Sequence, residues 1–146
     1  MDIFVFTSAN LTNIWAGVGA RQWAVSNEQA GNASIQGKAR KFAIGSLGIF
    51  YCVESQCLTT PFMVVSKPRF EEIVSHIWPG SWSLPFGIVP LGSPHKLLPV
   101  SRLAPKLPSL TSGQSWSSLF HVTPLTVFAS SKLTPEDWAV VVGELV

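Results

Sequence analysis

Aromatic side chains are the residues of this sequence whose types and spacing could do chemistry. The 146 residues include six tryptophans and a single tyrosine. Trp78 and Trp82 stand on either side of a Pro-Gly turn, where rings are often half exposed, and Trp23 precedes a polar stretch that begins at Ser26. Indoles supply flat stacking faces and one N–H donor, which suits a planar ligand. For these three tryptophans, a binding pocket and a hydrophobic core remain equally open.

Groups that could catalyse a reaction or bind a metal are present but are not arranged for it. Glu71 and Glu72 are neighbours that would point in different directions on a helix, and the three histidines lack the spacing of metal ligands. Cys52 and Cys57 are too far apart for a C-x-x-C pair, although they could face each other across a hairpin that turns at residues 54–56. We therefore expect two reduced thiols, no metal, no cofactor and no enzyme activity.

The distribution of charge favours a polyanionic partner. The net charge is only +2, but no Asp or Glu occurs between Ile73 and Pro135, or from Gln29 to Val53. Six cations are candidates for contacts with phosphate groups, although a solvated scatter of cations fits the charge pattern equally well. They are Arg21, Lys38, Arg40, Lys41, Lys67 and Arg69.

Hydropathy argues against a membrane protein. The best apolar run, from Phe42 to Val53, stops at Glu54 after 12 residues, which is too short to span a bilayer. The first residues carry no cationic region, so they indicate a strand and not a signal peptide. We predict a cytoplasmic protein without a membrane partner. Because only 12% of the residues are charged, we also expect a partner or ligand to cover part of the surface.

The elements that must position these residues mix strands with helices. Asn10 can cap a helix whose apolar face includes Trp15, and Thr134 followed by Pro135 begins a closing helix. Six of the eleven prolines lie in 85–108, which favours edge strand and ordered loop there. Several short strands with separated helices indicate an α+β domain and not a chain of alternating β/α units. The predicted elements are strands over 3–7, 47–53 and 61–65, and helices over 11–21, 70–76 and 135–145.

Four segments resemble the EVE family of the PUA-like superfamily, which is related to the YTH readers of methylated adenine. The family pattern W-x-G-V-x-N-x-Q-A-x-N is similar to W-A-V-S-N-E-Q-A-G-N at 23–32, with one residue missing after Trp23. The pattern V-G-D-x-x-x-F-Y-H-S is similar to I-G-S-L-G-I-F-Y-C-V at 44–53. Trp82 ahead of a strand at 86–91 and the L-T-P-E-D-W segment at 133–138 complete the resemblance, which covers nearly the whole chain.

The resemblance implies one domain over 1–146, a small PUA-like twisted β-barrel flanked by helices, whose pocket holds a flipped-out, modified base. Three alternatives remain: a general PUA-type RNA-binding protein without selectivity for a modified base, an ASCH-like hydrolase or nuclease, and a protein with a small-molecule pocket or a subunit of a larger complex. The partner would be RNA or DNA. The expected pocket residues are Trp23, Trp78 and Trp82 as stacking rings, with Ser26, Asn27, Gln29, Asn32 and Tyr51 as hydrogen-bonding groups.

Overall fold

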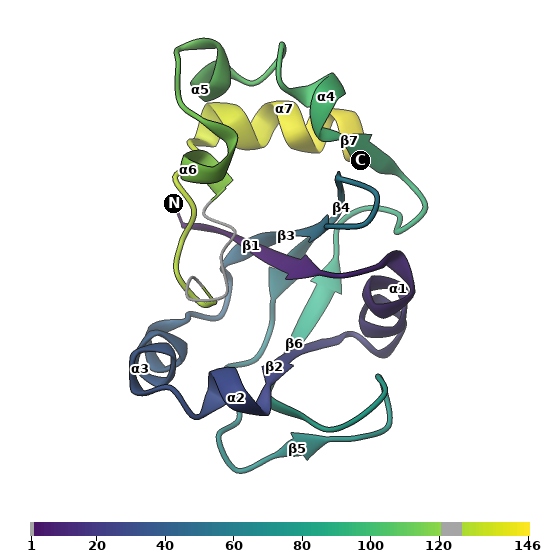
Figure 1. Ribbon diagram of the computed structural model, residues 1–146, viewed down its shortest axis with the longest axis vertical. Coiled ribbons are helices and arrows are strands. Elements are labelled where there is room, and N and C mark those ends of the chain that lie inside the picture. Colours follow the sequence, from purple (N-terminus) through teal and green to yellow (C-terminus); the bar gives the residue numbers. More distant parts are fainter. Residues whose placement is uncertain (1, 121–126) are drawn as a thin grey trace.

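Seven strands form one curled sheet with helices around it, as the computed structural model in Figure 1 shows. The structure describes residues 2–120 and 127–146. The strands are β1 (Ile3–Ser8), β2 (Gln22–Ser26), β3 (Leu47–Cys52), β4 (Cys57–Val64), β5 (Ile73–Val74), β6 (Trp82–Pro90) and β7 (Leu97–Pro99). The helices are α1 (Leu11–Ala20), α2 (Asn27–Ala30), α3 (Ala33–Lys41), α4 (Val100–Leu103), α5 (Pro108–Thr111), α6 (Trp116–Phe120) and α7 (Pro135–Leu145).

The order of the strands leaves the curled sheet open between its two end strands, β1 and β2. The main path runs β1-β3-β4-β6-β2, with β5 paired to β6 and β7 paired to β4. Strands β1 and β3 are parallel and the other pairs are antiparallel. Because β1 and β2 are the two ends of this path, the sheet forms a half-barrel with a gap between them. The expected α+β class and the PUA-like curled sheet flanked by helices are confirmed.

Two hydrophobic clusters lie on the two faces of the sheet. Alternation along β1 separates them, since Phe4 and Phe6 belong to the cluster inside the curl and Ile3 belongs to the other. The inner cluster is built on phenylalanine rings, among them the contact between Phe6 and Phe42 at 5.9 Å. The outer cluster joins the sheet to the C-terminal helices, and Val141 of α7 is fully buried in it.

Local capping explains where the two predicted terminal helices begin. The Asn10 side chain accepts a hydrogen bond from the Asn13 backbone N–H at the start of α1. Thr134 and Asp137 form a reciprocal capping box at the start of α7. Both helices and the strands near 3–7, 47–53 and 61–65 are confirmed within one or two residues at most ends; β4 begins four residues earlier than expected, at Cys57.

Two sequence expectations are wrong. The helix over 70–76 is absent, because Ile73 and Val74 form β5 and pair with β6 instead. Trp15 does not lie in the core: its ring is 40% exposed, and its indole N–H donates to the carbonyl oxygen of Pro94. The hairpin between β3 and β4 brings Cys52 opposite Cys57, as the sequence suggested, and both are free thiols. No helix in the described ranges is long and apolar enough to cross a membrane.

Candidate functional site

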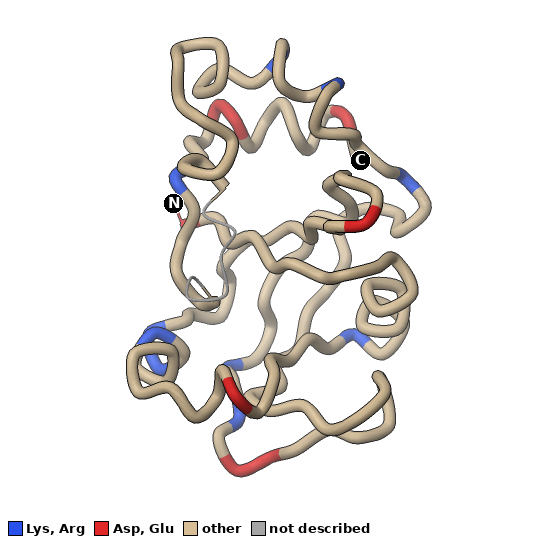
Figure 2. Tube along the Cα trace, in the orientation of Figure 1, with Lys and Arg blue, Asp and Glu red and all other residues tan. Residues whose placement is uncertain are grey.

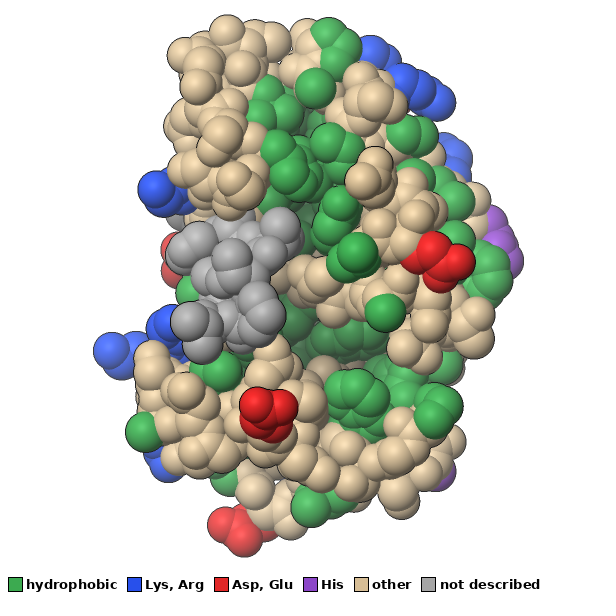
Figure 3. Space-filling view, in the orientation of Figure 1, with side chains coloured by type: hydrophobic (Ala, Val, Ile, Leu, Met, Phe, Trp, Pro, Cys, Tyr) green, Lys and Arg blue, Asp and Glu red, His purple; other side chains and the backbone are tan. Residues whose placement is uncertain are grey.

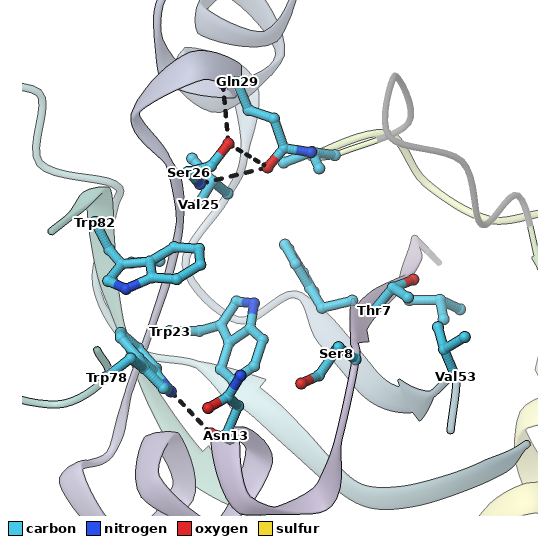
Figure 4. Close-up of a pocket in the computed structure, with 15 residues that line it drawn as sticks. Thr7, Ser8, Asn13, Trp23, Val25, Ser26, Gln29, Val53, Trp78 and Trp82 are labelled. Atoms are coloured by element: carbon cyan, nitrogen blue, oxygen red, sulfur yellow. Dashed lines mark hydrogen bonds between the residues drawn. The ribbon is translucent and has the colours of Figure 1, made fainter. Parts of the chain in front are cut away.

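A cavity of about 470 Å³ occupies the gap between the two edge strands. Residues 5–8 of β1 line one side and residues 23–26 of β2 line the other. Trp78, which precedes β6, and Trp82, the first residue of β6, also line the cavity. Figure 4 shows the three indoles on one side of the cavity, and Thr7, Ser8 and Val53 across from them. The cavity therefore lies along the line where the barrel does not close.

The three indoles form one wall of rings in edge contact. The ring centroids of Trp23 and Trp78 are 5.3 Å apart with an interplanar angle of 82°, and those of Trp78 and Trp82 are 6.0 Å apart at 66°. Trp78 Nε1 donates to the Asn13 carbonyl oxygen at 2.8 Å, and Trp82 Nε1 donates to the Pro79 carbonyl oxygen at 2.9 Å. Because these two N–H groups already have acceptors, both rings are fixed in position. The half-buried Trp82 ring leaves more of its surface open to a ligand than Trp78, which is 6% exposed.

The Trp23 ring packs closely against helix α1 at Gly17, which has no side chain to occupy that space. Its ring is 7% exposed and contacts the Phe50 ring at a centroid distance of 4.6 Å. A Cβ atom at Gly17 would lie 2.7 Å from Trp23 Cε3, which is too close for van der Waals contact. The glycine weakens α1 as an isolated helix, but it makes the space in which this ring packs.

The polar rim of the cavity comes from a helix cap and a strand edge. Ser26 and Gln29 form the capping box of α2, with the Gln29 backbone N–H donating to Ser26 Oγ at 3.1 Å. Along β1 the backbone N–H and C=O groups of successive residues point alternately toward β3 and away from it. The Ser8 carbonyl oxygen points toward β3 and accepts from the N–H of Val53, which follows β3. The Ile3 carbonyl oxygen points the other way and accepts from the Ser131 N–H. The peptide groups of Val5 and Thr7 therefore face away from β3, and both residues line the cavity.

The described residues that line the cavity include no charged side chain. None of them is Asp, Glu, Lys, Arg or His. The walls are mainly apolar, with Ser8, Asn13 and Ser26 among the polar side chains. In the described part of the chain, no group of three His, Cys, Asp or Glu side chains could hold a metal ion. Such a site suits a flat, uncharged ligand with a few hydrogen-bonding groups at its edge.

Three of the eight expected pocket residues lie elsewhere, because their side chains have other partners. The Asn27 side chain donates to Ser81 Oγ at 2.9 Å and accepts from Ser83 Oγ, which ties α2 to β6. Asn32 caps α3. Tyr51 points to the outer face of the sheet, where burial raises its pKa and its ring centroid lies 5.5 Å from that of Trp116. The other five residues line the cavity: Trp23, Ser26, Gln29, Trp78 and Trp82.

The expected phosphate-contacting cations lie outside the cavity, and most gather on or near α3. Arg40 lies 4.7 Å above the centre of the Phe70 ring, and Lys67 Nζ donates to the Arg40 carbonyl oxygen at 2.7 Å. Arg69 is paired with Glu72 at 2.7 Å. Arg21 is exposed at the end of α1, separate from the basic cluster on α3 that Figure 2 shows. The remaining two, Lys38 and Lys41, border a smaller hollow of about 180 Å³.

Sequence reasoning missed the contribution of β1 and Asn13 to the cavity. The predicted strand over 3–7 carried no sign that it would be an edge strand, since this depends on which strands pair with it. Asn13 lies within the predicted helix over 11–21, and nothing in that pattern marks it as a residue that lines a cavity. The one available signal was Asn10, which fixes the start of α1 and so places Asn13 in its first turn.

Solved structures with a similar fold are YTH domains. The Pho92 YTH domain in complex with m6A matches with a TM-score of 0.64 at 12% identity, over 97% of this chain and 84% of that chain. The complex of the YTH domain-containing protein mmi1 with RNA matches with a TM-score of 0.60 at 16% identity, over 98% and 80% of the two chains.

The YTH domain of the Zygosaccharomyces rouxii MRB1 protein, in complex with N6-methyladenosine RNA, matches with a TM-score of 0.56 at 12% identity, over 78% and 75% of the two chains. At these identities the comparison shows a shared fold. No family model matches the sequence, and neither does any curated protein. The chain thus has the PUA-like fold seen in YTH domains.

Proposed function

We propose that this chain is an RNA-binding module that holds one flipped-out, methylated base in the cavity between β1 and β2. The observation that carries the proposal is the wall formed by Trp23, Trp78 and Trp82 in a cavity of about 470 Å³ whose described lining residues carry no charge. Extruding a base from its stack costs a few kcal/mol. Contact with an aromatic ring returns about 1–3 kcal/mol for a base of any type.

The edge of the base would meet the polar side of the cavity. The peptide groups of Val5 and Thr7 offer both donors and acceptors, and Asn13 adds a side-chain amide, whereas the Ser8 hydroxyl already donates to the Asn10 carbonyl oxygen. A methyl group on the base would lie among the indoles, where burial of one such carbon contributes about 0.8 kcal/mol. We propose N6-methyladenine as the base, because structures of the same fold contain m6A or N6-methyladenosine RNA.

The cations would act on the phosphate backbone and not on the base. Arg40 and Lys67 lie together on the surface, so they are the best candidates among the six for contacts with consecutive phosphates. Membership of the EVE family, the organisation as one domain and a cytoplasmic location stay predictions from the sequence.

A fluorescence titration tests the proposal directly, since three tryptophans line the cavity. We expect N6-methyladenosine to quench tryptophan emission at concentrations at which adenosine does not, and methylated RNA to bind more tightly than unmethylated RNA or methylated DNA of the same sequence. Trp15→Ala is the matched control, because this indole is outside the cavity. Equal affinity for methylated and plain RNA would favour a general RNA-binding protein, and no binding of either would refute the proposal.

A further inference from the structure

A second group of aromatic residues lies on the other side of strand β1 from the cavity. Val5, Tyr51 and Trp116 are half-buried and pack against the outer cluster. Val5 also lines the cavity, so the two surfaces share a residue. Figure 3 shows hydrophobic side chains gathered in hollows in both the upper and the lower half of the molecule, on the face that β1 crosses in Figure 1.

The register of the sheet places Tyr51 one strand away from the rim of the cavity. Thr7 lines the cavity and is the partner of Tyr51 in the parallel pair of β1 and β3. Val53, two residues after Tyr51, also lines the cavity and is exposed. Neighbouring strands are about 4.8 Å apart, so a strip of three residues without charge, Thr7, Val53 and Tyr51, leads from the rim of the cavity to the Tyr51 ring.

Trp116 completes this strip as a fixed, half-buried ring. Its centroid lies 5.5 Å from that of Tyr51, with an interplanar angle of 54°. The Phe120 ring packs against it at 3.8 Å and 31°, and Phe120 itself is fully buried. Trp116 is therefore held by the core through Phe120 while part of its own ring stays open to solvent.

We propose that Tyr51 and Trp116 form a stacking platform for the base of the nucleotide next to the one held in the cavity. This inference rests on the function proposed above. It explains why an aromatic pair lies beside the cavity on a strip without charged side chains, which suits a base and not a phosphate. Adjacent bases of one strand would then lie on opposite sides of β1, with the backbone crossing its edge.

Abasic oligonucleotides test the platform without changing the protein. The probe is a five-nucleotide RNA with N6-methyladenosine at its centre, compared with versions that lack the base of the preceding or of the following nucleotide. All phosphates remain, so the electrostatic contribution to binding stays constant. We expect one of the two abasic versions to bind about tenfold more weakly, which is the scale of one lost stack.

Trp116→Ala should produce the same loss with the intact RNA. It should cause no further loss with the sensitive abasic RNA, and it should leave the affinity for the N6-methyladenosine nucleoside unchanged. Trp15→Ala is the control and should alter none of these values. If Trp116→Ala does not fold, the comparison of intact and abasic RNAs on the unmodified protein still tests whether a neighbouring base contributes to binding.

The outcomes separate the two proposals. If neither abasic version binds more weakly than the intact RNA, the platform is refuted while the cavity stands. If the unmodified protein binds neither the nucleoside nor the intact RNA, the proposed function fails and the platform fails with it. A loss with one abasic RNA that Trp116→Ala does not reproduce also refutes the platform, because the stacking ring would then lie elsewhere.

Discussion

Trp78 and Trp82 lie side by side in the cavity wall, yet their replacement by alanine should have different effects. The Trp82 ring is half-buried, contacts one other aromatic ring, and has its N–H bonded to Pro79, three residues away. Trp78 is only 6% exposed, contacts the rings of both Trp23 and Trp82, and its N–H reaches Asn13, 65 residues away. Trp82 therefore belongs to the surface of the cavity and Trp78 to its support.

The expected magnitudes follow from these contacts. Trp82→Ala removes one edge contact between rings, about 0.5–1.5 kcal/mol, and one local hydrogen bond, about 1 kcal/mol. It also removes a stacking face for the ligand, about 1–3 kcal/mol, so the dissociation constant should rise by about 5- to 150-fold. Trp78→Ala opens a cavity in the core and should cost about 3–5 kcal/mol, a large part of the stability of a domain of this size.

Thermal melting and RNA titration on the same samples distinguish the two effects. At about 2–4 °C per kcal/mol, Trp82→Ala should lower Tm by about 3–10 °C and Trp78→Ala by about 6–20 °C. In the folded protein, Trp82→Ala should show the larger loss of affinity per degree of Tm lost. The reasoning is refuted if folded Trp82→Ala binds methylated RNA as the unmodified protein does, or if Trp78→Ala melts at the original temperature.

Three further predictions follow from single contacts. Gly17→Ala should lower the free energy of unfolding by about 1–3 kcal/mol and weaken RNA binding, because the new Cβ displaces Trp23; Gly19→Ala in the same helix, which would meet nothing within 4 Å, should be neutral or stabilising, and equal melting of the two would contradict the steric argument. Burial raises the pKa of Asp137, but hydrogen bonds from Ser109 and Thr134 outweigh it and hold this pKa below its ordinary value of 3.8. The stabilisation should thus be full above that value and disappear as the pH falls below it through the folded-state pKa, and acid unfolding followed by circular dichroism should show no such loss in Asp137→Asn. Replacing the basic side chains of α3, Lys38, Arg40 and Lys41, by alanine should weaken binding to every RNA alike and reduce the dependence of affinity on salt. An unchanged salt dependence would show that these three residues do not contact the RNA.

Sequence patterns predicted an element correctly where the interactions that form it lie within a few residues of one another. The closing helix begins at Pro135 as predicted, because a cap, a proline at the first position and acidic residues in the first turn all act within four residues. The part of the pocket formed by Trp23, Ser26 and Gln29 was also predicted, since these three residues lie in one continuous segment of the resemblance. The PUA-like fold class followed from the four resembling segments together. Local patterns failed at 70–76, where pairing with the distant strand β6 makes Ile73 and Val74 a strand.

By itself the sequence determined several of the elements, among them β1, α1 and α7, and which side chains could stack on a base or bond to its edge. Only the tertiary structure decided which of those side chains meet. Tyr51 lies on a correctly predicted strand, but alternation along a strand defines two faces without saying which of them turns toward the cavity. The role of β1 was equally undetermined, because a strand is an edge only if one of its two sides has no partner strand, and this depends on every other strand of the sheet. The cavity forms where β1 and β2 fail to meet, so its position is a property of the whole barrel and of no single segment.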